Sequence, residues 1–283
     1  MDDPRDISRA VALFEERYGT TSRRGDLGAL GDLLPRFAHL PYENLSKILA
    51  WSNGAVRPIE ARRGPLRVME DHLAVGTGGT CFSLTELLRC VARSAGLQCF
   101  PVMAHMRHGA NIHCALRVEA GGRAYLVDPG YLLRTPLRLA NQPPRLGDQP
   151  GSALIVPAGS LDPPPPPGVP AGDFDLYTVE PEGPRWRYRF ADRPVSEEEF
   201  LGHWNRSFLQ PAMRSLLVTS RGDGGELVYL HNHKLRRQGA DGKRTTNVRA
   251  ELDRRVAESF GIDPAVTRQA ASLVAALRAP RRP

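Results

Sequence analysis

The apolar residues of this chain recur with a helical period up to about residue 95 and with a strand period after it. The clearest helix is predicted over residues 81–95, where Leu84, Leu88 and Val91 return at helical spacing and share one face. Gly96 follows as a signal for the end of that helix. Further helices are predicted at 7–18, with Asp6 as N-cap and Gly19 as stop, at 27–34 and at 43–51.

Short segments between residues 100 and 191 are rich in β-branched and aromatic residues and are separated by Gly or Pro. They are residues 100–106, 111–118, 123–131, 153–159, 174–180 and 185–191. Such a succession of antiparallel strands predicts a barrel or a sandwich. Residues 136–170 contain 11 prolines, including the run Pro163–Pro167, and we expect a long loop with polyproline II character there.

The last part of the chain mixes the two periods again. A helix is predicted at 197–208, strands at 215–221 and 225–235, and two helices within 248–278. The order of helices, then strands, then mixed elements predicts the α+β class.

The composition excludes several classes of protein. Hydrophobic residues make up 41% of the 283 residues and charged residues 24%, which excludes a mainly disordered chain. No apolar run reaches the about 18 residues of a membrane span. The acidic start also lacks the basic and apolar regions of a secretory signal peptide. We therefore expect a cytoplasmic protein with no membrane partner.

The four cysteines lie within 34 consecutive residues and form no C-x-x-C pair. They are Cys81, Cys90, Cys99 and Cys114. This clustering is not typical of a disulfide framework, and it lacks the ligand pairs of a structural zinc site. The sequence therefore predicts four reduced thiols.

The excess positive charge lies in the last 50 residues. Residues 234–283 hold 12 Lys plus Arg against 5 Asp plus Glu, which accounts for the whole net charge of +7. One interpretation is a surface that attracts nucleic acid or a phosphorylated cofactor, and the other is a solvated basic helical face. Phe260 is the only aromatic residue after Tyr229, so nucleic-acid bases would find few rings to stack on, and we expect no nucleic-acid partner.

A glycine-rich turn leads directly into the helix predicted at residues 81–95. It contains Gly76, Gly78 and Gly79, and Thr80 can act as the N-cap of the helix. The free N–H groups and the dipole at a helix N-terminus favour a thiolate over a thiol, so Cys81 is a candidate nucleophile. A buried structural cysteine is the alternative interpretation.

A base for this thiol is predicted from one hairpin. His113 precedes and Asp128 follows the turn sequence VEAGGRA. A turn at Ala120-Gly121 places His113 directly opposite Asp128, and a turn at Gly121-Gly122 places the two diagonally on one face. A three-residue loop puts them on opposite faces. Two of the three registers therefore favour a His–Asp pair.

Single residues of these types are commonly structural. A histidine in a strand is often a satisfied core residue, and an aspartate before Pro-Gly is often a turn residue. Combined with Cys81, however, His113 and Asp128 favour a Cys-His-Asp catalytic triad. His105, His108 and His113 lack regular ligand spacing, and we predict no metal site.

At these residues the chain resembles the arylamine N-acetyltransferases. Members of that family carry Arg-Gly-Gly-x-Cys-Phe-Glu around the nucleophile, where this chain has Thr77–Ser83. They carry Pro-Phe-Glu-Asn-Leu upstream, where this chain has Pro41–Leu45. Fifteen residues after a histidine they carry Val-Asp-x-Gly-Phe around the aspartate, here His113 and Val127–Tyr131.

The resemblance covers about residues 35–135 and implies three domains. These are a helical bundle with the nucleophile at 1–95, a β-barrel with the histidine and aspartate at 96–195, and an α/β lid at 196–283. It implies a triad of Cys81, His113 and Asp128. It also implies substrate contacts from Tyr42, Thr80, Phe82 and Tyr131, and a coenzyme A contact at Gly130.

The chain departs from the family pattern near the nucleophile. Thr77 and Ser83 replace an arginine and a glutamate, so both members of the expected ion pair are lost together. Further replacements are Thr85 for asparagine, Pro129 for a small residue and Leu132 for glycine.

The resemblance implies an acyltransferase that moves an acetyl or other acyl group from coenzyme A to an aromatic or related amine through an acyl-cysteine. Acetyl-coenzyme A or another acyl thioester is then a co-substrate, a small-molecule amine is the acceptor, and we expect no permanently bound cofactor. The alternative is an amide synthase that takes its acyl group from an acyl carrier protein, whose acidic surface would suit the basic C-terminal part. A thiol hydrolase or transglutaminase-like enzyme and a non-catalytic binding protein remain further alternatives.

Overall fold

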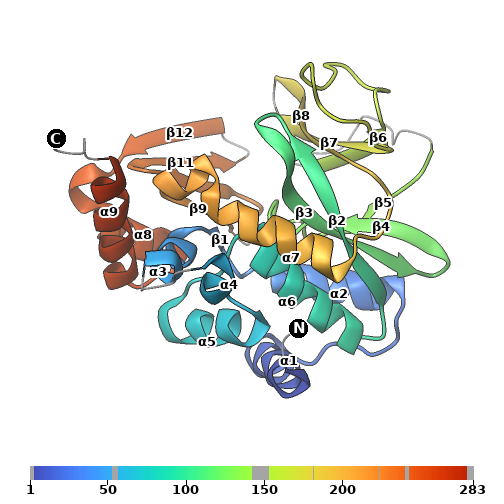
Figure 1. The fold of residues 1–283 in the computed structure, drawn as a ribbon, viewed down its shortest axis with the longest axis horizontal. Coiled ribbons are helices and arrows are strands. Elements are labelled where there is room, and N and C mark those ends of the chain that lie inside the picture. Colours follow the sequence, from blue (N-terminus) through green and yellow to red (C-terminus); the bar gives the residue numbers. More distant parts are fainter. Residues whose placement is uncertain are drawn as a thin grey trace.

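The first 94 residues are mainly helical in the computed structural model, which describes residues 3–52, 57–141, 153–180, 182–222, 224–239 and 242–278 (Figure 1). The helices are α1 (Pro4–Tyr18), α2 (Leu27–Phe37), α3 (Leu45–Ser52), α4 (Pro58–Ala61), α5 (Pro65–Val75) and α6 (Cys81–Ser94). The helices predicted at 7–18, 27–34, 43–51 and 81–95 are confirmed within a few residues at their ends.

The structure corrects two details of this helical part. Asp3, not Asp6, is the N-cap of α1, and its carboxylate accepts a hydrogen bond from the backbone N–H of Arg5 at 2.8 Å. Helices α4 and α5 were not predicted, because each begins with a proline that interrupts the apolar pattern in the sequence.

The middle of the chain forms an antiparallel sheet of short strands. They are β2 (Gln98–Met106), β3 (Gly109–Ala120), β4 (Arg123–Val127), β5 (Leu137–Arg138), β6 (Ala153–Pro157), β7 (Phe174–Glu180) and β8 (Gly183–Phe190). Their order in the sheet is β5-β4-β3-β2-β8-β7-β6, and the two edge strands β5 and β6 contact each other. The sheet is therefore a nearly closed barrel, as predicted. The proline-rich loop predicted at 136–170 lies partly outside the described residues.

The hairpin of β3 and β4 has the second of the three predicted registers. Leu116 pairs with Val127 and Ala120 pairs with Arg123, so Gly121 and Gly122 form the turn. Both glycines have positive φ, 56° and 70°, as a two-residue turn of this kind requires. The register that opposes His113 directly to Asp128 is therefore wrong.

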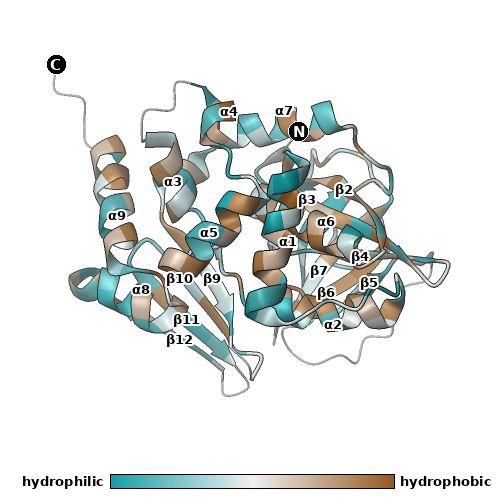
Figure 2. Ribbon diagram, turned by 90° about the horizontal axis from the view of Figure 1, so that it is seen from below, coloured by the Kyte–Doolittle hydropathy of each residue, from teal (hydrophilic) through white to brown (hydrophobic). Residues whose placement is uncertain are grey.

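The last part of the chain forms a second sheet covered by helices. Its elements are α7 (Glu197–Arg206), β9 (Leu217–Arg221), β10 (Leu227–His231), β11 (Lys234–Gly239), β12 (Gly242–Asn247), α8 (Leu252–Phe260) and α9 (Pro264–Arg278). The predicted strand at 225–235 is two strands that reverse at Asn232, which has a φ of 56°. Strand β12 was missed because its sequence is polar throughout, and it has hydrophilic colours in Figure 2.

An N-terminal segment belongs to this second sheet. Strand β1 (Tyr42–Glu43) pairs with β9, giving the order β1-β9-β10-β11-β12, and α3 packs against α9. The nucleophile region therefore contacts both sheets.

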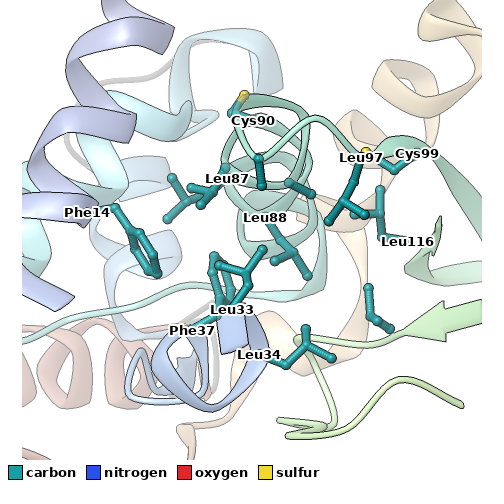
Figure 3. Packing of buried hydrophobic residues seen from close by; sticks show 14 of the residues in the cluster. Phe14, Leu33, Leu34, Phe37, Leu87, Leu88, Cys90, Leu97, Cys99 and Leu116 are labelled. Atoms are coloured by element: carbon teal, nitrogen blue, oxygen red, sulfur yellow. The ribbon is translucent and has the colours of Figure 1, made fainter. Parts of the chain in front are cut away.

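Helix α6 is the centre of the largest hydrophobic cluster. Figure 3 shows Leu87, Leu88 and Cys90 of α6 packed among Phe14, Leu33, Phe37 and Leu116 from α1, α2 and β3. Burial of an apolar side chain of this size stabilises the fold by about 1.5–3 kcal/mol, so these contacts hold α6 against α1, α2 and β3. Within the described residues, none of the helices is long and apolar enough to cross a membrane.

Candidate active site

Cys81 is the first residue of α6 and is only 5% exposed. The glycines before it allow the loop to pass close to β1. A Cβ on Gly78 would lie 1.9 Å from the carbonyl oxygen of Pro41, and Gly79 forms a parallel bridge with Tyr42. Thr80 is the N-cap but makes no side-chain capping bond, so the first N–H groups of α6 remain available beside the thiol.

His113 and Asp128 lie against this helix end. The imidazole Nε2 of His113 lies 2.7 Å from Oδ2 of Asp128, and both residues are buried. The phenol of Tyr188 donates to the same oxygen at 2.7 Å. The backbone N–H groups of Gly130 and Tyr131 donate to the other oxygen at 2.8 and 3.1 Å. Asp128 is therefore fixed from four directions, and Nδ1 of His113 is left for the thiol.

The electrostatics of this group favour an ion pair. A hydrogen bond from Cys114 and one from His113 lower the pKa of the Cys81 thiol well below its usual value, and outweigh its burial. Burial disfavours the imidazolium of His113, but the charge and hydrogen bond of Asp128 raise its pKa to about 10. The structure thus brings Cys81, His113 and Asp128 together, in an environment that favours the thiolate of Cys81 and the imidazolium of His113.

The other predicted site residues surround the side chains of Cys81, His113 and Asp128. Tyr131 meets the imidazole of His113 edge-on, with 5.5 Å between ring centroids. Tyr42 interacts electrostatically with Cys81, and both burial and the charge of Cys81 raise its phenol pKa well above the usual value. Phe82 is completely buried against Phe200 and Trp204 of α7, so its ring supports the site from behind.

Gly130 packs against His113, Asp128 and Cys81. A Cβ built there would lie 3.1 Å from Oδ1 of Asp128 and 3.4 Å from Cβ of Cys81. Leu132, which replaces a glycine of the family pattern, has a φ of 51° and is only 2% exposed. The backbone at Leu132 therefore keeps the left-handed conformation that favours glycine, and the leucine side chain makes that conformation strained.

A guanidinium occupies the space beside Thr77, although that residue is not arginine. Arg63, only 7% exposed, donates to the carbonyl of Gly78 at 2.9 Å and lies 3.5 Å from Oγ1 of Thr77. Its Nη1 lies 3.8 Å from Oε1 of Glu43, which is completely buried, and its Nη2 lies 2.9 Å from Oδ2 of Asp71. The cation is therefore not lost from the site but supplied from the loop before α5.

Several site residues were missed at the sequence level. They are Lys47, Arg63, Cys114 and Tyr188. Tyr188 and Arg63 carry no local signal, because only the tertiary fold brings them to the site. Cys114 had one signal, since it directly follows His113. Within the described residues no group of three or more His, Cys, Asp or Glu is arranged to hold a metal ion, and His105 instead accepts a hydrogen bond from the N–H of Asn111.

Comparison with known proteins identifies the family and the fold of the chain. A family model described as N-acetyltransferase matches residues 26–268. No curated protein matches the chain. The arylamine N-acetyltransferase of Mycobacterium abscessus has 17% identity and a TM-score of 0.78, with 96% of each chain covered. That of Nocardia farcinica has 19% identity and a TM-score of 0.76, with 97% of this chain and 100% of the other covered.

A third similar solved structure comes from Bacillus cereus. The arylamine N-acetyltransferase of Bacillus cereus, described as having a unique Cys-His-Glu catalytic triad, has 16% identity and a TM-score of 0.68. The comparison covers 93% of this chain and 100% of the other. Likeness at such low identity shows the fold alone, whereas the family model spans most of the sequence. The chain therefore belongs to the arylamine N-acetyltransferase family and is an N-acetyltransferase of divergent sequence.

Proposed function

We propose that this enzyme transfers an acetyl or other acyl group from coenzyme A to an aromatic or related amine through an acyl-cysteine at Cys81. The observation that carries the proposal is the 2.7 Å contact of His113 with Asp128 at the N-terminus of the helix that begins with Cys81. The Cys-His-Glu triad described for the Bacillus cereus relative supports the same roles for cysteine, histidine and carboxylate.

The first half-reaction forms the acyl-cysteine. The Cys81 thiolate attacks the thioester carbonyl, and the N–H groups at the start of α6 hold the oxygen that becomes negative. The tetrahedral intermediate then expels the coenzyme A thiolate, which takes the proton of His113. Asp128 keeps the imidazole in the orientation and tautomer that this transfer needs.

The second half-reaction forms the amide. Neutral His113 accepts a proton from the amine as the amine attacks the acyl carbon, and Cys81 leaves as a thiolate. We place the acceptor between Tyr42, Thr80 and Tyr131, with the ring of Phe82 behind. Aromatic side chains here favour a flat acceptor, because offset and edge-to-face ring contacts stabilise it.

The second sheet supports a path for the donor. Tyr42, Thr219, Tyr229 and Arg236 lie directly opposite one another on consecutive strands and so share one face. At about 4.8 Å per strand, Arg236 lies roughly 14 Å from Tyr42. A phosphopantetheine arm has about thirteen bonds from sulfur to phosphorus and spans roughly 15 Å when extended. Its phosphate would then lie at Arg236 while its thiol end lies beside Gly130.

Intact-protein mass spectrometry after incubation with acetyl-coenzyme A tests the proposal. We expect one added acetyl group on the wild type, none on Cys81→Ala, and loss of the group when an arylamine is added. An adduct that forms only with an acyl carrier-protein thioester would transfer the proposal to the amide-synthase alternative. Absence of any adduct together with an ordinary thiol titration of Cys81 would overturn it.

A further inference from the structure

A second thiol lies beside the proposed nucleophile. Cys114 follows His113 on β3 and is completely buried. Successive side chains of a strand point to opposite faces, so the two residues reach the site from different sides. His113 packs against Tyr188, with 5.0 Å between ring centroids, whereas Cys114 enters the hydrophobic cluster that contains Cys81.

The first two turns of α6 contact this thiol at two points. Cys81 and Thr85 are four residues apart and therefore lie on one face of the helix. The thiol of Cys114 donates to Oγ1 of Thr85 over 3.6 Å. Cys81 lies one turn before Thr85 and in the same buried cluster as Cys114, and interaction with Cys114 lowers the pKa of the Cys81 thiol. One S–H proton therefore has two acceptors within reach.

We propose that Cys114 is a positioning residue that donates its S–H to Cys81 when Cys81 is a thiolate and to Thr85 when Cys81 carries an acyl group. This inference rests on the proposed function, since it takes Cys81 as the nucleophile. Burial and the neighbouring Cys81 raise the pKa of Cys114 well above its usual value, so it stays protonated and can donate.

The S–H of Cys114 has an acceptor both when Cys81 is free and when Cys81 carries an acyl group. A buried donor without an acceptor is costly, and Thr85 removes that cost while the acyl group occupies the sulfur of Cys81. When the amine expels Cys81 as a thiolate, the S–H of Cys114 turns to the sulfur on which negative charge appears. Cys114 therefore acts on the release of the product, through Cys81, without contacting the substrate.

Other charged and titratable groups face Cys81 and must be kept constant in a test. They are His113 of β3, Lys47 of α3, Tyr42 of β1, and Asp128 and Tyr131 of the loop after β4. Lys47 is only 8% exposed, donates to Oγ of Ser207 at 2.6 Å, and has its pKa lowered by burial to about 8. Variants at position 114 leave all of these groups unchanged.

The test is the pH dependence of Cys81 alkylation by iodoacetamide, quantified on the Cys81 peptide by mass spectrometry. We expect Cys114→Ala to raise the apparent pKa of Cys81 by about one to two pH units, because it removes a donor to a charged acceptor. Cys114→Ser keeps a donor and should stay closer to wild type. Cys99→Ala, a buried thiol in the other cluster, is the matched control and should change nothing.

A second variant tests the same inference if Cys114→Ala does not fold. Thr85→Val removes the competing acceptor and should leave the apparent pKa of Cys81 unchanged or lower. It should also speed amine-dependent deacylation, because the acyl-enzyme then holds an S–H without an acceptor. A lowered wild-type pKa that Cys114→Ala does not move would overturn this inference alone. An ordinary wild-type pKa would also overturn this inference, and together with absence of an acetyl adduct it would overturn the proposed function as well.

Discussion

A side chain at position 130 would collide with the imidazole of His113, because a Cβ built on Gly130 lies 2.8 Å from Cε1 of that ring. The φ of Gly130 is not in the left-handed region, so the requirement for glycine is one of space. The loop after β4 therefore sets how far the ring can move from Cys81.

Gly130→Ala should fold and lose activity. We expect kcat/KM to fall roughly 100-fold, because small displacements of a reacting group have effects of this size. Gly31→Ala is the control, since nothing lies within 4 Å of the added atom and α2 gains a better helix former. Full activity of Gly130→Ala would contradict the assignment of His113 as the base.

Tyr188→Phe should destabilise the protein more than Tyr177→Phe. Tyr188 donates to the buried carboxylate of Asp128, and a hydrogen bond to a charged group contributes about 1.5–3 kcal/mol. Tyr177 donates to the neutral carbonyls of Leu161 and Pro163, where about 1 kcal/mol is expected. Urea unfolding of both variants checks the order, and equal losses would contradict the stronger hydrogen bond expected between Tyr188 and Asp128.

The titration of His113 should appear in the pH dependence of stability. In a Cys81→Ser background its folded pKa is still raised by Asp128 above the unfolded value of about 6.5. The stabilisation from the bound proton is therefore fully present below about pH 6.5 and is lost as the pH rises through the folded pKa.

The comparison is between Cys81→Ser and Cys81→Ser/His113→Gln. The difference in their free energies of unfolding should shrink above pH 6.5, by up to about 1.4 kcal/mol per pH unit. Urea titrations at pH 6, 7.5 and 9 measure it. A difference that grows with pH would mean that His113 is held neutral in the folded protein.

Arg63→Met should be strongly destabilising. It leaves the buried carboxylate of Glu43 without its cation and removes one of the two arginines that bind Asp71, and breaking a buried ion pair costs about 3–5 kcal/mol. Arg67→Met is the matched control, because Arg67 binds the same Asp71 from an exposed position and should cost under about 1 kcal/mol. Thermal and urea unfolding measure both.

Exchanging the residues at positions 63 and 77 tests directly whether Arg63 takes the place of the arginine that the family motif has at position 77. Arg63→Thr combined with Thr77→Arg returns the guanidinium to the position of the family motif. We expect the pair to regain most of the stability that Arg63→Thr loses alone. No recovery would mean that Arg63 stabilises the loop before α5 and not the carboxylate of Glu43.

Arg236→Gln should weaken donor binding without touching the chemistry. We expect KM for acetyl-coenzyme A to rise about tenfold, and the KM for an acetyl thioester of N-acetylcysteamine, which lacks the phosphate, to stay constant. Arg244 lies on the opposite face of the β11–β12 pair, so Arg244→Gln is the control. Salt should raise the KM of wild type more than that of Arg236→Gln.

The spacing of apolar residues was sufficient to predict many of the helices and strands. The helix at 81–95 and the strands from residue 100 follow from apolar spacing, because packing against one neighbour imposes that spacing. The turn between β3 and β4 left three registers open, because sequence patterns do not exclude Ala120 from the turn. The left-handed backbone at both central positions decides for Gly121-Gly122, since only glycine adopts it without strain.

The site was predictable only where its residues carry a local motif. Cys81 is preceded by its glycines, and His113 and Asp128 share a hairpin, so their proximity follows from local geometry. Lys47 interacts electrostatically with Cys81, and Arg63 contacts the glycine-rich turn before it, only because the tertiary fold brings α3 and the loop before α5 to this region. Neither has a neighbour in sequence that reveals such a role.

The position of Arg63 couples two segments of the chain that are distant in sequence. A buried Glu43 without a cation would cost several kcal/mol, a large part of the stability of an ordinary domain. Positions 43 and 63 are therefore energetically coupled, and a neutral substitution at one should be tolerated best together with a neutral substitution at the other.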